Sequence, residues 1–274
     1  MAIFTVFGNP VAHSLSPQIH QAFAQQIGVE LNYTRSLTSV SRFRRTVAEF
    51  FRTGGVGANV TVPFKQQAFD LVTYVTTRAQ QAGAVNTLVP LGYGQLLGDN
   101  TDGIGLVRDL QTNLQQKLTN RDVIILGAGG AARGVIAPLI EQGVASLTIA
   151  NRTIEKANLL VEQFAQPSLH ACRFDQLTIP TGALVINATS ASLSGQKLPL
   201  KTNELAHAEC AYDMMYGAQP TAFMQQAQQA GITAVHDGLG MLVEQAGAAF
   251  QMWHEGAELD TLKVIQKLRE SIGE

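Results

Sequence analysis

Apolar and polar positions along the chain follow the two-residue period of strands in some stretches and the helical period in others, and these stretches alternate. In the helical stretch over residues 17–28, Ile19, Phe23 and Ile27 share one face and Gly28 provides the stop. Such alternation of strand and helix predicts an α/β fold with a largely parallel sheet. In the first part of the chain, strands are predicted at residues 3–8, 31–37, 57–62 and 83–89, with a second helix at residues 40–54.

A polar stretch over residues 98–122 separates this part from a second α/β run. It predicts a loop, one helix with a polar face and a polar link. The sequence therefore predicts two α/β domains, which a length of 274 residues allows. The second run has predicted strands at residues 123–126, 146–152, 183–190, 210–215 and 233–238, and two helices follow them at residues 241–256 and 260–273.

A glycine-rich turn joins the first strand of the second run to the following helix. Its sequence, Gly-Ala-Gly-Gly-Ala-Ala over residues 127–132, fits the G-x-G-x-x-G/A dinucleotide fingerprint. Gly127 permits the tight turn, Gly129 lets backbone approach a pyrophosphate, and Ala132 lets helix pack near strand. The alternative is a plain small-residue turn. A P-loop is excluded because no Gly-Lys-Ser/Thr follows.

The end of the next strand indicates which dinucleotide binds. NAD-binding domains usually have a carboxylate there for the ribose 2′-hydroxyl. This chain has Asn151, Arg152 and Thr153, with Lys156 three residues further on. A guanidinium and an ammonium favour the 2′-phosphate of NADP. The alternative is that both cations belong to a solvated helix start, and Glu155 between them weakens the positive field.

Several polar residues of the first part follow or end predicted strands. Asn59 and Thr61 share one strand face, and Lys65 follows the same strand after Pro63. Asn86 and Asp102 occupy similar places further along the chain. Ligands in open α/β sheets gather at such strand ends. Each residue also has an ordinary structural interpretation, such as a turn former, a helix cap or a surface lysine.

Two serines lie where the first strand gives way to the first helix. Ser16 before Pro17 has the pattern of a helix N-cap, which leaves Ser14 unexplained. Two hydroxyls at a helix start would suit a small carboxylate. Near the end of the chain, Gln245 shares a helical stripe with apolar residues and requires a partner if it is buried. That partner could be a ligand or backbone.

The overall composition narrows the classes of ligand and location. A net charge of −2 gives no basic stripe for nucleic acid, and no apolar run approaches the roughly 20 residues that span a bilayer. Cys172 and Cys210 form no disulfide framework, and six scattered histidines show no metal-ligand spacing. With no basic, cleavable leader pattern at the N-terminus, a cytoplasmic protein without a metal site is expected. A homodimer is compatible with the sequence.

Taken together, these motifs resemble those of the shikimate dehydrogenase family, NADP-dependent enzymes of aromatic amino acid biosynthesis. The resemblance implies reversible reduction of 3-dehydroshikimate to shikimate. It also implies a substrate domain of residues 1–101 plus 239–274, to which the last helices return, and a Rossmann-type NADP domain of residues 102–238. The matching segments are GNPVAHSLSP, GANVTVPFK, GAVNTL, GDNTDGIG, GAGGAARG, NRT, INATS, YDMMYG and DGLGMLVEQAGAAFQMW.

The resemblance also assigns roles by position. Lys65 and Asp102 match the catalytic pair, and Ser14 and Ser16 match the carboxylate binders. Further substrate contacts are implied for Asn59, Thr61, Asn86, Tyr216 and Gln245, together with Lys65 and Asp102 themselves. Cofactor contacts are implied for Gly127, Ala128, Gly129, Gly130, Ala131, Asn151, Arg152, Thr153, Lys156, Thr189, Met214, Gly238 and Met241.

Three positions depart from the family pattern, namely Lys156, Ala132 and Ser192. Two alternatives remain open. One is a shikimate/quinate dehydrogenase that uses NAD or accepts quinate. The other is a non-catalytic NADP-binding protein on the same scaffold, against which the presence of both Lys65 and Asp102 argues.

Overall fold

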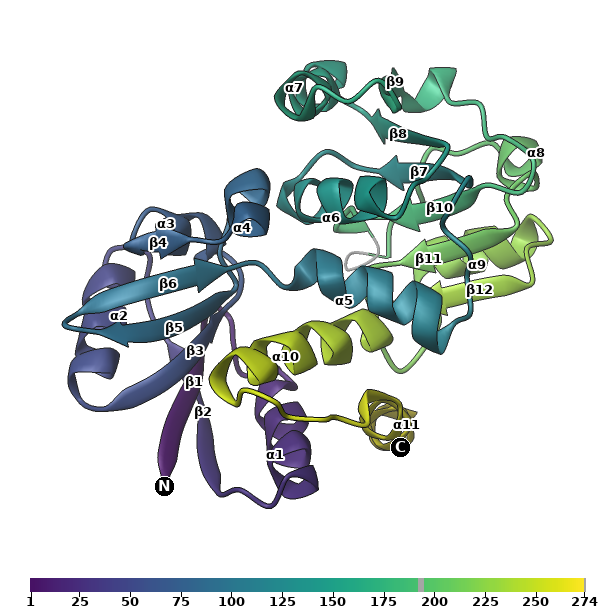
Figure 1. Ribbon diagram of the computed structural model, residues 1–274. Helices are drawn as coiled ribbons and strands as arrows, with labels where there is room; N and C mark the ends of the chain where they lie inside the picture. The colour runs from purple at the N-terminus through teal and green to yellow at the C-terminus, as the bar shows by residue number, and fades with distance from the viewer. Residues whose placement is uncertain (192–194, 274) are drawn as a thin grey trace. The chain divides into compact units, whose positions relative to one another are not determined.

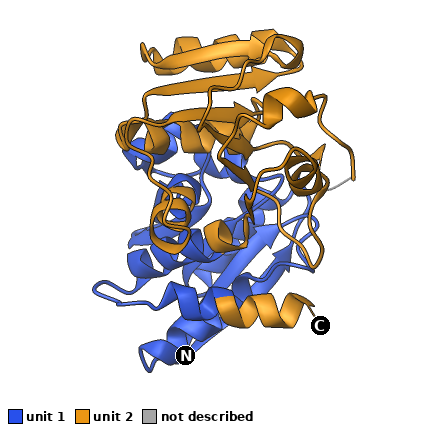
Figure 2. Ribbon diagram, turned by 90° about the vertical axis from the view of Figure 1, so that its right-hand side faces the viewer, with its two compact units in different colours: residues 1–105, 243–265 blue, residues 106–242, 266–274 orange. Residues whose placement is uncertain are grey.

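The computed structural model describes residues 1–191 and 195–273 (Figure 1). Two compact units are present: unit 1 comprises residues 1–105 and 243–265, and unit 2 comprises residues 106–242 and 266–274 (Figure 2). This division differs from the predicted one, which placed all of residues 239–274 in the first domain. Arg269 donates to the Asp237 carboxylate at 2.7 and 2.5 Å, so the end of the last helix is tied to unit 2.

Unit 1 is built on a six-stranded sheet in the order β2-β1-β3-β5-β6-β4. β5 is antiparallel to both β3 and β6, whereas the other pairs are parallel. The strands are β1 (Ala2–Gly8), β2 (Leu31–Leu37), β3 (Gly55–Val60), β4 (Tyr74–Val75), β5 (Thr87–Gly92) and β6 (Gln95–Asp99), and the helices are α1 (Ser16–Gln26), α2 (Phe43–Arg52), α3 (Lys65–Phe69) and α4 (Thr77–Ala82).

The sheet is largely parallel, as predicted, and a tight hairpin accounts for its one antiparallel strand, β5. Tyr93 and Gly94 join β5 to β6, and their φ angles are +50° and +75°. Two successive residues with positive φ match the strand twist of a two-residue hairpin. Because β5 reverses direction, its N-terminal end lies at the same sheet edge as the C-terminal ends of β1, β3 and β6. That edge collects the polar residues described below.

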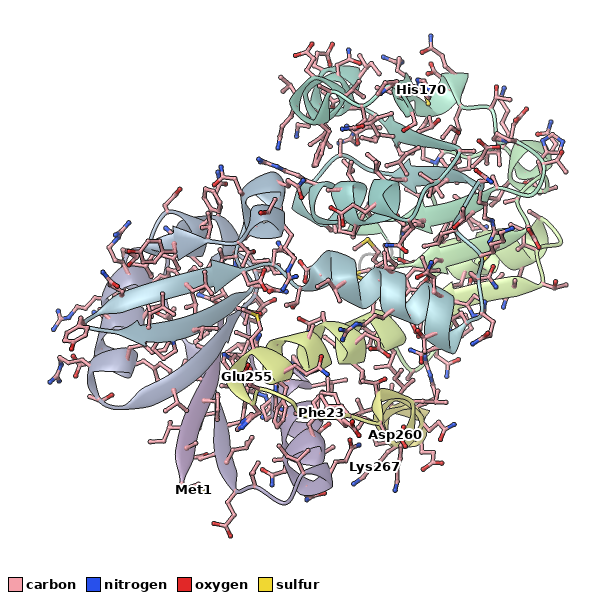
Figure 3. All side chains as sticks on the ribbon, viewed as in Figure 1. Met1, Phe23, His170, Glu255, Asp260 and Lys267 are labelled. Carbon is pink, nitrogen blue, oxygen red and sulfur yellow. The ribbon has the colours of Figure 1, made fainter. Side chains whose placement is uncertain are left out.

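Aromatic side chains form much of the unit 1 core. The buried ring of Phe23 on α1, labelled in Figure 3, lies 5.6 Å from the ring of Phe250. On the other side of β1, Phe7 packs edge-on against Phe43 of α2, which stacks on Phe64. The buried rings place β1 and β3 between helices on both sides, so their ends have a rigid support.

Unit 2 contains a fully parallel six-stranded sheet in the order β12-β11-β10-β7-β8-β9. Its central strands are largely apolar, as expected for a sheet with both faces covered. The strands are β7 (Asp122–Leu126), β8 (Ser146–Asn151), β9 (Leu169–Arg173), β10 (Leu184–Asn187), β11 (Cys210–Asp213) and β12 (Ala234–Asp237), and the helices are α6 (Gly130–Glu141), α7 (Ile154–Phe164), α8 (Thr202–Leu205) and α9 (Ala222–Gln229).

Three further helices contain the boundaries between the units, namely α5 (Asp102–Arg108), α10 (Leu239–Trp253) and α11 (Thr261–Gly273). A π-helical turn, η1 (Asp109–Asn113), continues α5. In the part of the chain that the structure describes, no helix is both long enough and apolar enough to cross a membrane. Cys210 is buried and Cys172 is half-buried, each as a free thiol.

Candidate active site and cofactor loop

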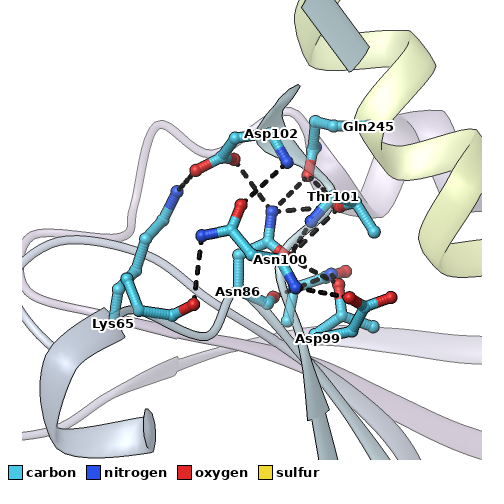
Figure 4. A network of polar contacts seen from close by, with 10 residues as sticks. Lys65, Asn86, Asp99, Asn100, Thr101, Asp102 and Gln245 are labelled. Carbon is cyan, nitrogen blue, oxygen red and sulfur yellow. Dashed lines mark hydrogen bonds and ion pairs between the residues drawn. The ribbon is translucent and has the colours of Figure 1, made fainter. Parts of the chain in front are cut away.

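Lys65 and Asp102 form an ion pair at the polar sheet edge of unit 1 (Figure 4). Lys65 is the first residue of α3, which follows β3, and Asp102 is the first residue of α5, which follows β6. The Lys65 Nζ lies 2.5 Å from the Asp102 Oδ2, and the side chains are 29% and 14% exposed. A half-buried lysine held by a carboxylate at an accessible edge can deliver a proton to a bound substrate.

Asn86 links this ion pair to the neighbouring chain segments. Its Nδ2 donates to the Asp102 Oδ1 at 2.8 Å, and its Oδ1 accepts the Thr101 backbone N–H at 3.0 Å. The Gln245 Oε1 lies 3.3 Å from the Asn86 Nδ2 and 3.4 Å from the Thr101 hydroxyl. The partners of Gln245 therefore include side chains of unit 1, a possibility that its helical stripe did not reveal. The structure brings Lys65, Asn86, Asp102 and Gln245 together.

A buried carboxylate, which the sequence analysis did not single out, supports the loop that presents Asp102. Asp99 is fully buried at the end of β6 and accepts from Thr76 at 2.5 Å, from the Asn100 backbone at 2.7 Å and from both arms of Arg78. Asn100 in turn accepts the Asp102 backbone N–H at 3.1 Å. The segment from Asp99 to Asp102 is thus held by charge-assisted hydrogen bonds at its base. The sequence signal for Asp99 is weak, because only the last two residues of β6 are buried.

The serine pair lies at the start of α1, with Ser16 buried and Ser14 half-buried. The Ser14 hydroxyl donates to the Ser16 Oγ at 3.1 Å, and the Ser14 Oγ accepts the Ser16 backbone N–H at 3.3 Å. The predicted N-cap role of Ser16 is wrong. The helix begins at Ser16 itself, and Leu15 is the N-cap residue, whose side chain makes no capping hydrogen bond. Ser16 therefore keeps its hydroxyl for other partners.

Asn59 is buried, and both ends of its amide contact protein groups. Its Nδ2 donates to the Asn86 carbonyl at 3.1 Å and to the Thr87 hydroxyl at 3.3 Å. Its Oδ1 accepts from the Tyr33 hydroxyl at 2.6 Å and lies 3.1 Å from the His20 Nε2. The carbonyl partner fixes which end of the amide is the donor, so His20 carries its proton on Nε2.

His20 lies in an aromatic environment that keeps it neutral. Its ring stacks on Tyr33 at 4.4 Å and is 5.2 Å from the ring of Trp253. Burial lowers the pKa of His20 to about 3, an effect that the hydrogen bond with Asn59 only partly opposes. The unfolded chain therefore takes up this proton before the folded chain does. The contribution of His20 to stability is complete above the unfolded pKa of 6.5 and is lost as the pH falls toward 3.

We expect unit 1 to lose about 2 kcal/mol of unfolding free energy through His20 between pH 7 and pH 5. In a His20→Gln variant, the amide can still donate to Asn59 but does not titrate, so the fall over this interval should shrink by that amount. Urea unfolding followed by fluorescence of Trp253, the single tryptophan, reports on unit 1. Replacing the exposed His170 with glutamine is the control. An unchanged pH dependence in His20→Gln would contradict this explanation.

Two predicted substrate residues remain, Thr61 in unit 1 and Tyr216 in unit 2. Thr61 directly follows β3 and is half-buried, and its backbone N–H donates to the Phe7 carbonyl at 2.9 Å. Tyr216 belongs to unit 2. Burial and then the charge of Asp237 raise the pKa of Tyr216. A substrate role for either residue stays a prediction.

The glycine-rich loop of unit 2 has the geometry of a phosphate cradle. Gly127 has a φ of +106°, and a Cβ there would come within 2.9 Å of the Thr189 Cγ2, so glycine is required. A Cβ at Gly129 or Gly130 would meet no described atom within 4 Å, so the backbone there is open. α6 starts at Gly130, with Gly129 as N-cap and no side-chain cap. Its first N–H groups can therefore bind a pyrophosphate.

Behind this loop, a buried polar network orders the strand ends of unit 2. Asn187 donates to Asp213 at 3.0 Å and accepts from the Thr189 hydroxyl at 2.7 Å. At Gly238, a Cβ would lie 2.3 Å from the Met214 carbonyl oxygen, so only glycine allows this close approach. Met214 and Met241 are buried in the same core cluster, against which Ala128 and Ala131 pack.

The residues predicted to bind the 2′-phosphate follow β8. Asn151 donates to the Thr153 carbonyl at 2.8 Å, and Thr153 is the N-cap residue of α7. Arg152 and Lys156 are both exposed, and neither forms an ion pair with any residue that the structure describes. Two exposed cations in the unit that carries the open glycine loop fit an NADP site. Ser192, one of the departures from the family pattern, lies outside the described residues.

Comparison with known proteins places the chain in a family. Residues 6–88 match the family model of the shikimate dehydrogenase substrate binding domain, and residues 109–200 match that of shikimate / quinate 5-dehydrogenase. A shikimate dehydrogenase (NADP(+)) from Cellvibrio japonicus is 48% identical over 99% of this chain and 98% of its own length. The chain belongs to the shikimate dehydrogenase family.

Two further members of the shikimate dehydrogenase family match this chain over 99% of its length. A shikimate dehydrogenase (NADP(+)) from Nitrosospira multiformis is 51% identical over 99% of this chain and 98% of its own. Among solved structures, shikimate 5-dehydrogenase from Thermus thermophilus in complex with NADP(H) and shikimate has a TM-score of 0.87 and 32% identity, covering 99% of this chain and 100% of that one. The predicted fold class, two α/β domains with a Rossmann-type second domain, is confirmed.

Proposed function

We propose that this protein is an NADP-dependent shikimate dehydrogenase that interconverts 3-dehydroshikimate and shikimate in aromatic amino acid biosynthesis. The observation that carries the proposal is the Lys65–Asp102 ion pair, held by Asn86 at an accessible sheet edge. Two relatives that are 48% and 51% identical to this chain are named shikimate dehydrogenase (NADP(+)). The ion pair supplies what reduction of a ring ketone needs besides a hydride, namely a proton donor next to hydrogen-bonding groups.

In this proposal the cofactor is held by unit 2. Gly127, Gly129 and Gly130 would bind the pyrophosphate through backbone N–H groups, and Arg152 with Lys156 would bind the 2′-phosphate. Reduced NADP supplies the hydride when it is bound. Thr189, held by Asn187, and the close Met214–Gly238 contact would give the remaining part of the site a fixed shape.

In this proposal, residues of unit 1 carry out the proton transfer. Lys65 donates a proton from Nζ to the oxygen of the ketone as that oxygen gains negative charge, and takes it back in the reverse direction. Asp102 keeps the ammonium in place and can accept a hydrogen bond from a neighbouring substrate hydroxyl. Asn86 and Gln245 orient that carboxylate and offer further polar atoms to the ring hydroxyls.

Ser14 and Ser16 would bind the substrate carboxylate with their hydroxyls. Ser14→Ala removes one donor to a charged group, so kcat/KM for shikimate should fall by about 10- to 150-fold, mainly through KM. Steady-state kinetics with shikimate measure this loss. Replacing the substrate carboxylate by its amide should reproduce most of it in the wild type. A Ser14→Ala enzyme with unchanged shikimate kinetics would contradict the carboxylate assignment.

The whole proposal is tested by following NADP reduction with shikimate, with quinate and with no substrate. Turnover with shikimate supports the proposal. Turnover with quinate alone would favour a quinate dehydrogenase, and NADP binding without turnover would favour a non-catalytic protein. We further propose that the protein acts in the cytoplasm on free small molecules and has no role in nucleic-acid binding.

A further inference from the structure

A line of polar contacts runs from the serine pair through the interior of unit 1 to Asn86. Ser14 donates to Ser16 at 3.1 Å, and the Ser16 side chain neighbours the Tyr33 phenol, whose pKa it lowers against the larger effect of burial. Tyr33 donates to the Asn59 Oδ1 at 2.6 Å, and the Asn59 Nδ2 donates to the Asn86 carbonyl at 3.1 Å. Groups at the two ends belong to the proposed substrate site, whereas those in the middle are buried.

The polar atoms of Asn59 and Tyr33 are already engaged by protein groups, which leaves them poorly suited to bind substrate directly. The Asn59 amide donates to two oxygens and accepts from two donors, and it is only 6% exposed. Tyr33 is 8% exposed, with its hydroxyl between Ser16 and Asn59. Burial raises its pKa well above 10.0, so the phenol keeps its proton. Both residues are therefore placed to act on substrate through Ser16 and Asn86.

Because of His20, the direction in which the Tyr33 hydroxyl donates its hydrogen bond can reverse. The Asn59 Oδ1 has two donors, the Tyr33 hydroxyl and the His20 Nε2–H. When the Ser16 hydroxyl turns away from Tyr33 to donate to an anion, the Tyr33 proton can turn from Asn59 to the Ser16 Oγ. Asn59 then keeps His20 as its donor, so the buried Asn59 Oδ1 is not left unpaired. A hydroxyl that accepts a hydrogen bond becomes a stronger donor in the hydrogen bond that it makes itself.

We propose that Tyr33 is a positioning residue for the substrate, and this proposal rests on the proposed carboxylate role of the serines. Tyr33 donates to Ser16 when the carboxylate binds, and Asn59 and His20 support Tyr33. Asn59 reaches the backbone carbonyl of Asn86, whereas the side-chain amide of Asn86 holds Asp102, so Tyr33 lies nearer to the serines than to the Lys65–Asp102 pair along this line. Loss of the Tyr33 hydroxyl therefore affects binding of the carboxylate more than the chemical step.

The test is Tyr33→Phe, which keeps the ring that stacks on His20. We expect KM for shikimate to rise by about 3- to 10-fold, with kcat changed less than about 2-fold and KM for NADP unchanged. Tyr74→Phe is the matched control, since Tyr74 is in unit 1 and its side chain is 52% exposed. The melting temperature, followed by Trp253 fluorescence, shows whether unit 1 has kept its stability. An unchanged or lower KM in Tyr33→Phe would overturn the inference.

Coupling to Ser16 separates a positioning role from a general loss of structure. In a Ser16→Ala background, Tyr33→Phe should raise KM no further, because the group through which Tyr33 acts is gone. Additive effects of the two substitutions would overturn the inference. If Ser16→Ala alone left KM unchanged, the proposed carboxylate site would fail. If Ser16→Ala raised KM but Tyr33→Phe did not, only the role of Tyr33 would fail.

Discussion

Replacing Lys65 with alanine is expected to lower kcat by about 10²- to 10⁴-fold, with KM for shikimate changed far less. Acid-base assistance contributes about this factor, and it is exerted in the transition state more than in the bound ground state. In the structure the Lys65 ammonium lies 2.5 Å from the Asp102 carboxylate, so its position is fixed before substrate arrives. Steady-state kinetics in both directions measure the loss.

Asp102→Asn tests the same unit from the other side. The substitution keeps the shape of the side chain but removes the charge that holds Lys65, and should also lower kcat. Because the two groups act together, the double variant should be little worse than the poorer single variant. Direct binding of NADP should be normal in all three. A Lys65→Ala enzyme with near-normal kcat and a large rise in KM would make Lys65 a substrate anchor instead.

Arg152→Ala is expected to raise KM for NADP by about 10- to 150-fold and to leave the use of NAD nearly unchanged. The physical reason is the loss of a charge-assisted hydrogen bond to the 2′-phosphate, a group that NAD lacks. Arg152 is exposed and has no ion-pair partner among the described residues, so its removal breaks no described ion pair of unit 2.

Kinetics with both cofactors decide this prediction. Lys267→Ala is a suitable control, because Lys267 is an exposed cation of unit 2 that no proposed contact involves (Figure 3). Equal losses for NADP and NAD in Arg152→Ala would show that Arg152 supports the loop instead of selecting the cofactor. The Lys156→Ala variant should show a smaller change in the same direction, since an ammonium makes no bidentate contact with phosphate.

Local patterns were enough to predict most elements of the fold. The strand at residues 31–37 is observed as β2 with the same bounds, and the helices at residues 17–28 and 40–54 are observed as α1 and α2 with shifted or shorter ends. β4, β6 and β9 were missed. β6 is short and lies after a turn whose Tyr93 has a positive φ, which an aromatic residue rarely adopts and so gives no turn signal. The antiparallel hairpin was therefore not predicted.

Strand ends in the sequence pointed to candidate residues such as Lys65 and Asp102, which the structure joins in an ion pair. Their supports were not predictable, because a buried polar residue shows its partners only in three dimensions. Asp99 needs Arg78 and Thr76, which lie more than 20 positions away in the chain. Likewise, Asn59 was predicted to contact substrate, and only its buried partners Tyr33 and His20 suggest a supporting role.

The division of the chain into units has a consequence for the order of events on the ribosome. Residues 106–242 are synthesised between the two segments of unit 1. The second segment brings Trp253, whose indole donates to the Leu88 carbonyl at 3.1 Å, and Gln245, which contacts Asn86. Unit 1 is therefore begun first, yet it stays incomplete until residue 265 has emerged. By then nearly all of unit 2 is already outside, so the part of the protein that starts the chain is among the last to be finished.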